Sequence, residues 1–141
     1  MDINSLDRFL QAQELKYATA LKEIQKGKKR THWMWYIFPQ LRGLGKSNMS
    51  YVYGINGIDE AKAYLAHPVL SARLIEICEA LLEHKDKCAY DIFGDIDDMK
   101  LQSSMTLFSY VSEKGSIFHN VLESFYKNEI DKRTLDLIKN K

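Results

Sequence analysis

Apolar residues recur at steps of three and four along most of this chain, and this periodicity limits the possible folds most strongly. One such apolar stripe runs through residues 69–82 and covers one face of a helix. The chain has only two prolines and seven glycines in 141 residues, so few positions interrupt this pattern. Only residues 51–53 and 92–93 look like strands, and both stretches are short. The sequence therefore predicts a single all-α domain over residues 1–141, with seven or eight helices and no significant sheet.

Capping and breaking residues divide the pattern into helices, because Ser, Thr, Asp and Asn favour helix starts whereas Gly and Pro interrupt helices. Residues 39–47 are predicted to form a loop, and residues 48–55 and 88–93 a turn or short helix each. The other helices are expected to begin at Asn4 or Ser5, Thr31, Asp59, Pro68, Asp97 or Asp98, Ser116 and Asp131.

The apolar faces of these helices predict the core. Cys78 and Cys88 do not form a Cys-x-x-Cys motif and are too few for a disulfide framework. We therefore expect two buried, unbridged thiols in a reduced, cytoplasmic protein. The predicted core consists of Leu10, Tyr17, Trp35, Phe38, Leu74, Cys78, Leu81, Leu107, Phe108, Val121 and Phe125.

Composition excludes several classes of protein. Hydrophobic residues make up 45% of the chain and charged residues 28%, which is typical of a globular domain and argues against disorder. The formal net charge is only +1, which disfavours a nucleic-acid partner. No apolar run reaches the roughly 18 residues of a membrane-spanning helix, and residues 1–5 do not resemble a signal peptide. No metal-ligand spacing and no cofactor motif is found.

The densest motif covers residues 31–47, where an aromatic block with Trp33 and Trp35 leads into a glycine-rich basic loop. Arg42 and Lys46 flank two glycines in this loop, an arrangement that suits a phosphate or carboxylate. A solvated surface loop is the alternative interpretation. The end of the loop matches part of the phosphate-binding pattern G-x-x-x-x-G-K-[ST], but Gln40 occupies the position of the first glycine and no strand precedes it.

A second polar segment covers residues 97–106. On a helix, Lys100 shares a face with Ser103 and Ser104, and a lysine beside a serine can form a nucleophile–base pair when the lysine is neutral. Asp97 or Asp98 would instead keep the lysine charged. Small hydroxyl side chains also permit close helix packing, and a polar wall of a ligand pocket is the interpretation we favour.

The two segments together predict one concave site for an anion, because both contain helix starts with free N–H groups. His32 is the preferred general base, since histidine titrates near neutral pH, although a structural role is more common for any single histidine. The predicted catalytic residues are His32, Lys100 and Ser104. The predicted ligand-binding residues are Trp33, Trp35, Gln40, Arg42, Lys46, His67 and Asp98.

Several motifs resemble a family of small bacterial proteins of unknown function that automatic annotation often mislabels "calpastatin". The resemblance spans nearly the whole chain and implies an all-helical domain with no established activity. Its two most specific blocks are the aromatic block and the segment that begins at Asp97. The matching motifs are Arg8-Phe9 with Gln13, residues 29–35, Phe38-Pro39-Gln40, Gly43-Leu44-Gly45, Glu60-Ala61, Tyr64-Leu65, His67-Pro68 with Leu70, Arg73-Leu74, residues 92–94, 97–101 and 103–108.

Three functions compete at this point. The first is a small enzyme or binding protein for an anionic, nucleotide-like small molecule, in which Trp33 or Trp35 stacks a ring and Arg42, Lys46 and Lys100 hold charge. The second is a protein–protein interaction module without catalytic activity, with exposed aromatic residues at its interface. The third, single-stranded nucleic-acid binding, lacks a basic stripe. The oligomeric state is left open.

Overall fold

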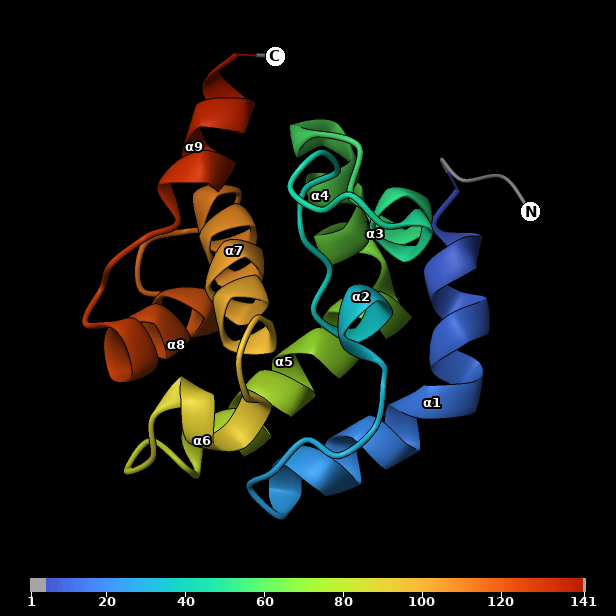
Figure 1. Cartoon of the computed structure of the whole chain (residues 1–141). Coiled ribbons are helices and arrows are strands. Elements are labelled where there is room, and N and C mark those ends of the chain that lie inside the picture. Colours follow the sequence, from blue (N-terminus) through green and yellow to red (C-terminus); the bar gives the residue numbers. More distant parts are fainter. Residues whose placement is uncertain (1–4, 141) are drawn as a thin grey trace.

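The computed structural model describes residues 5–140, and it confirms the predicted all-α class (Figure 1). Over these residues the chain forms nine helices and no strand, more than the seven or eight predicted, because residues 48–53 and 89–93, each expected as a turn or short helix, are both helical. The helices are α1 (Asp7–Gln25), α2 (Met34–Ile37), α3 (Asn48–Tyr53), α4 (Ile58–Ala66), α5 (Pro68–Leu82), α6 (Ala89–Phe93), α7 (Asp97–Tyr110), α8 (Ile117–Tyr126) and α9 (Lys132–Lys139). No helix within residues 5–140 is long and apolar enough to cross a membrane.

Helix α5 lies between two groups of helices (Figure 1). It packs against α1 and α4 on one side and against α8 on the other. Helix α7 contacts α6, α8 and α9, whereas the short α2 packs against α1 and α3. This arrangement places the aromatic block of residues 33–38 between the N-terminal helix and the C-terminal helices.

The core contains most of the predicted residues, and four of them are less buried than expected. Leu10, Tyr17, Trp35 and Phe125 are only partly buried and pack against the edge of the core. Each lies where its helix face turns toward solvent, which periodicity alone does not resolve. The fully buried large side chains include Trp33, a residue that the sequence placed in a ligand site.

Several helix starts differ from the prediction. Asp131 precedes α9 as expected, and its side chain accepts a hydrogen bond from the Thr134 N–H at 3.1 Å. Ser116 precedes α8 but makes no cap bond, since its hydroxyl lies 2.9 Å from His119 Nδ1. Thr31 does not cap α2, because both its backbone N–H and its hydroxyl bind Glu23. The predicted cap is therefore replaced by a tertiary contact.

An isolated β-bridge joins Leu41 to Ile55 and was not predicted. The Ile55 N–H donates to the Gln40 carbonyl oxygen at 2.9 Å, and the Arg42 N–H donates to the Ile55 oxygen at 2.8 Å. A Cβ atom at position 54 would lie 2.7 Å from Arg42 Cα, so this approach requires glycine. The bridge fixes the loop after α2 and thereby positions Gln40.

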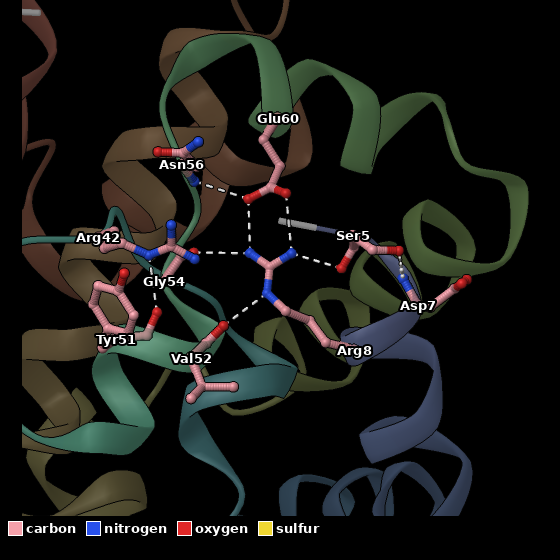
Figure 2. Close-up of polar contacts among 9 residues, drawn as sticks. All are labelled: Ser5, Asp7, Arg8, Arg42, Tyr51, Val52, Gly54, Asn56 and Glu60. Carbon is pink, nitrogen blue, oxygen red and sulfur yellow. Dashed lines mark hydrogen bonds and ion pairs between the residues drawn. The ribbon is translucent and has the colours of Figure 1, made fainter. Parts of the chain in front are cut away.

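A buried arginine ties α1 to the segment that contains α3 and α4 (Figure 2). Arg8 is fully buried, and its guanidinium forms a paired salt bridge with the Glu60 carboxylate at 2.7 and 3.0 Å. The same guanidinium donates to the carbonyl oxygens of Ser5, Val52 and Gly54 at 2.6, 2.7 and 2.9 Å. All three guanidinium nitrogens are thus satisfied within the fold, which indicates a structural role.

A buried carboxylate has the same role at the other end of α1. Glu23 accepts hydrogen bonds from the Arg30 N–H at 2.7 Å, from both Thr31 donors at 2.7 and 3.0 Å, and from Trp33 Nε1 at 2.8 Å. Burial by itself raises the pKa of Glu23, but these hydrogen bonds outweigh it and lower the pKa to about 2. Glu23 therefore holds the residues after α1 against the helix.

The two cysteines are free, as predicted, but only one is buried. Cys78 lies in the core, where its Sγ is 3.8 Å from Met105 Sδ, whereas Cys88 is exposed just before α6. The expectation of two buried thiols is wrong for Cys88, because α6 is too short to cover the residue that precedes it. Burial also raises the pKa of the Cys78 thiol.

We expect a thiol reagent such as dithionitrobenzoate to label Cys88 immediately and Cys78 only when the protein unfolds, because the thiolate is the reactive form. The measurement is the number of labelled thiols with time, with and without urea. The Cys88→Ser variant serves as the control and should show no rapid labelling under native conditions. Two rapidly labelled thiols in the native protein would contradict the burial of Cys78.

Candidate functional site

Two adjoining hollows share Gln40 and Lys100, and we call them together the Gln40–Lys100 cleft. The first is narrow, with about 10 Å³ open to the centre of a water molecule, roughly the room of one water. The second offers about 190 Å³. Met34, Trp35, Phe38, Gln40, Ser50, Tyr53, Gly54 and Lys100 line the first hollow. Gln40, Leu44, Gly45, Ile96, Met99, Lys100, Ser103, Asp131 and Arg133 line the second.

Lys100 separates the two hollows and is held by an aromatic ring and a carboxylate. Its Nζ lies 5.1 Å from the centre of the Trp35 ring and 3.5 Å from Asp97 Oδ1. Asp97 Oδ2 also binds Lys29 Nζ at 2.9 Å, so one carboxylate serves two ammonium groups. Both contacts of Lys100 suit an ammonium ion. Lys29 and Lys100 together carry two positive charges against the single negative charge of Asp97, so one positive charge is not neutralised. Lys100 is thus a fixed cation at the cleft.

Gln40 is the polar group that distinguishes this cleft from an ordinary surface depression. Its residue is only 9% exposed, and it lines both hollows. Within residues 5–140 its side-chain amide makes no hydrogen bond, while its backbone oxygen is held by the Ile55 N–H. These amide atoms still reach solvent at the cleft, because the fully buried side-chain polar atom without a partner in the described residues is the Ser104 hydroxyl oxygen. Gln40 therefore offers a donor and an acceptor to a molecule in the cleft.

The second hollow has a further cation at its other side. Arg133 Nη2 donates to the Leu44 carbonyl oxygen at 3.1 Å, and its remaining guanidinium N–H groups bind no other group in the described part of the chain. Asp131 is the acidic residue of this hollow, but its Oδ2 is used by the Ser103 hydroxyl and by the first turn of α9. Two cations thus face one partly engaged carboxylate, which favours an anionic ligand.

Ser104 lies one turn after Lys100 on α7, but it does not line either hollow. Its hydroxyl is fully buried and is without a hydrogen-bond partner. The Nζ of Lys100 instead lies against Asp97 Oδ1 and the Trp35 ring. The structure therefore leaves Ser104 as a buried, unsatisfied hydroxyl outside the cleft lining and does not pair it with a base.

Of the ten predicted site residues, only Trp35, Gln40 and Lys100 share the cleft. His32 is exposed and lines neither hollow, so the structure does not bring the proposed base together with Lys100. Trp33 is buried in the core with its Nε1 bound to Glu23, and it cannot stack on a ligand. The prediction of one pocket for all of these residues is therefore wrong.

The other predicted ligand-binding residues serve the fold or lie outside the cleft. Arg42 packs on the Tyr51 ring at 4.9 Å and donates from Nε to the Tyr51 oxygen at 2.9 Å (Figure 2). His67 Nδ1 accepts from the Val69 and Leu70 N–H groups and so caps α5. Lys46 is exposed outside both hollows. The Asp98 Oδ1 accepts from the Met99 N–H at 2.8 Å, and the backbone carbonyl oxygen of Asp98 accepts from the Tyr126 hydroxyl.

Sequence reasoning missed the contribution of the C-terminal segment. Arg133 and Asp131 lie about 90 residues beyond Gln40, and no local motif connects them with the aromatic block. Asp131 was recognised only as a helix cap. The cleft closes because α9 packs against α7, and no spacing within the sequence encodes that contact.

Ile96, at the rim of the second hollow, has an unusual backbone conformation. Its φ of 75° and ψ of −55° place a β-branched residue in a region that strongly disfavours it, directly before the first residue of α7. Ile96 is also 61% exposed, so burial of its side chain does not explain this strain. Strained residues of this kind often occur next to functional sites, which supports the choice of this cleft.

No group of three or more His, Cys, Asp or Glu side chains in the described part of the chain is placed to hold a metal ion. The polar groups that line the cleft are instead the Lys100 ammonium, the Arg133 guanidinium, the Gln40 amide, several hydroxyls and the Asp131 carboxylate. The ammonium and the guanidinium suit an oxyanion.

Comparison with known proteins places the chain in a family. The family described as "Protein of unknown function (DUF1810)" matches residues 3–138. A solved structure titled as the conserved hypothetical protein Rv1873 from Mycobacterium tuberculosis is 41% identical, covers 98% of this chain and 99% of its own, and superimposes with a TM-score of 0.94. Among curated proteins no match is found. Since the family match extends over nearly the whole sequence, the chain belongs to the DUF1810 family of proteins of unknown function.

Proposed function

We propose that this protein binds a small anionic molecule in the Gln40–Lys100 cleft. The observation that carries the proposal is Gln40, a residue that is only 9% exposed, lines both hollows and makes no side-chain hydrogen bond within residues 5–140. Lys100 and Arg133 lie around the second hollow and supply positive charge. A ligand oxygen between these groups would receive charge-assisted hydrogen bonds, which are stronger than those between neutral groups.

The shape of the cleft limits the ligand. The narrow hollow beside Trp35 has room only for a water-sized group, and the ammonium of Lys100 already covers the Trp35 ring. Stacking of a nucleotide base on Trp35 would therefore require Lys100 to move. A compact carboxylate or phosphate with at most a small apolar extension fits the hollows as they stand.

A protein-interaction role is the second candidate, because Ile96 and Met99 at the rim are 61% and 62% exposed. Two side chains form a smaller apolar surface than a typical interface core. The two functions differ in their test, since a protein partner would depend on Ile96 and Met99, whereas a small anion would depend on Lys100 and Gln40.

Titration of the purified protein with phosphate, pyrophosphate, acetate, malonate and citrate tests the proposal. We expect at least one of these anions to bind, with a change in tryptophan fluorescence and a measurable heat. Lys100→Met and Gln40→Leu should each weaken binding by about 10- to 100-fold, which corresponds to the loss of one charge-assisted hydrogen bond of about 1.5–3 kcal/mol.

Lys46→Met is the matched control, because Lys46 is exposed on the same loop but does not line the cleft. It should bind within two-fold of the native protein. Trp35→Phe should abolish the fluorescence response while retaining the heat. Equal losses in the Lys46 and Lys100 variants, or no binding of any anion in the panel, would refute the proposed function.

A further inference from the structure

Another hollow, which is lined mainly by basic residues, lies at the end of α1 and shares no lining residue with the Gln40–Lys100 cleft. It has a volume of about 260 Å³. We call it the basic hollow. Its lining consists of Thr19, Lys22, Glu23, Lys26, Lys28 and Arg30.

The four basic residues of this hollow are not used by the fold. Lys22, Lys26, Lys28 and Arg30 are all exposed, and within residues 5–140 none of their side chains forms an ion pair or a hydrogen bond. Lys29, in the same segment, provides the contrast. Its ammonium turns inward to Asp97 at 2.9 Å and lies 5.1 Å from the Trp33 ring. Residues 22–30 therefore contain one lysine that stabilises the fold, Lys29, and four basic side chains that pair with no other group in the described residues.

The single carboxylate in the hollow does not neutralise these cations. Glu23 uses both of its oxygens to bind the Arg30 and Thr31 N–H groups, the Thr31 hydroxyl and Trp33 Nε1. Four donors already spread its charge, so it is not available as a salt-bridge partner. A net positive potential in the hollow follows from four cations facing one engaged carboxylate.

The overall net charge of +1 hides this concentration. Residues 22–30 hold five of the chain's twenty basic residues and one of its nineteen acidic residues, so the remainder of the chain is net negative. The negative end of the α1 dipole favours some of these lysines. That effect is confined to the last turn of a helix, whereas Lys28 and Arg30 lie beyond the end of α1 at Gln25.

We propose that the basic hollow binds a small oligophosphate, a compact ligand with several adjacent negative charges. Four flexible cations around one concave surface can each meet a different phosphate oxygen, and the uncommitted charges cost no native ion pair. The volume of the hollow is near the lower limit of small-molecule sites, which selects a short phosphate chain over a polymer. The basic hollow shares no residue with the Gln40–Lys100 cleft, so this inference does not depend on the proposed function.

Calorimetric titration with sodium tripolyphosphate at 150 mM salt tests the inference. We expect saturable one-to-one binding that weakens steeply as salt is raised. A variant with Lys22, Lys26, Lys28 and Arg30 all changed to glutamine should bind at least 30-fold more weakly.

The matched control changes four other exposed lysines, Lys62, Lys114, Lys132 and Lys139, to glutamine and so lowers the net charge by the same amount. It should retain binding within three-fold, and thermal unfolding should show that both quadruple variants are folded. Equal losses in the two variants, or no binding by the native protein, would overturn the inference. A short single-stranded RNA that binds the native protein more tightly than tripolyphosphate would also overturn it in favour of a nucleic-acid surface.

Discussion

Replacement of Arg8 by methionine is expected to lower the free energy of unfolding by about 3–5 kcal/mol, the typical cost of leaving a buried charge without its partner. The guanidinium is fully buried and donates to Glu60 and to the carbonyl oxygens of Ser5, Val52 and Gly54. Methionine fills a similar volume but has no donor, so the Glu60 carboxylate and the carbonyl groups lose their partners. Domains of this size unfold with only about 5–15 kcal/mol, so the effect is a large fraction of the total.

Urea unfolding followed by circular dichroism measures this effect. Arg30→Met is the matched control, because Arg30 is exposed and its side chain makes no contact that the fold requires; its stability should change by less than about 0.5 kcal/mol. The double variant Arg8→Met with Glu60→Met should recover part of the loss, since it removes the unpaired carboxylate. If Arg8→Met is as stable as Arg30→Met, the network is not what holds α1 to the following helices.

Glu23→Gln is expected to destabilise the protein by about 1.5–3 kcal/mol at pH 7, the magnitude of a hydrogen bond to a charged group. The glutamine keeps the shape of the side chain but presents N–H donors to at least one of the four donors that Glu23 binds. Glu123→Gln, on the exposed face of α8, removes the same charge and should change stability by less than about 0.5 kcal/mol.

The same glutamate predicts a pH dependence. Its pKa is near 4.5 in the unfolded chain and about 2 in the folded protein, so the folded state favours the ionised form. The resulting stability is fully present above about pH 5 and is lost as the pH falls toward 2. Unfolding curves between pH 6 and pH 3 should therefore show a smaller loss of stability for Glu23→Gln than for the native protein. Parallel curves for the two proteins would show that Glu23 does not carry this linkage.

Helix periodicity predicted the fold class well, because the signal is local. The stripe over residues 69–82 became α5, and Asp131 caps α9 as its residue type indicates. The local signal failed where a distant residue competes for the same group. Thr31 was expected to cap a helix, but Glu23 takes both its N–H and its hydroxyl. Residues 51–53 look like a strand but complete α3, and the described residues 5–140 contain no strand that could pair with them.

The candidate site was predicted only in part for the same reason. Residue type identified Trp35, Gln40 and Lys100 as groups for a ligand, and these three line the cleft. Residue type did not distinguish Trp35 from Trp33, which is buried because its Nε1 binds Glu23. His67 looked like a site residue but caps α5. Identical side chains thus have different roles according to which neighbours the fold supplies.

The sequence by itself determined the helical class, most helix boundaries and the types of group available for binding, because each depends on residues within one or two turns of each other. Only the tertiary structure decided which charged and polar groups form bonds within the protein and which are left without a partner for a ligand to bind. Arg8, Lys29 and Glu23 are satisfied internally, whereas Gln40 and the cations of the basic hollow are not. The physical reason is that desolvation and pairing depend on segments far apart in the chain, such as the loop after α2 with Gln40 and helix α9 with Arg133, which line the same hollow.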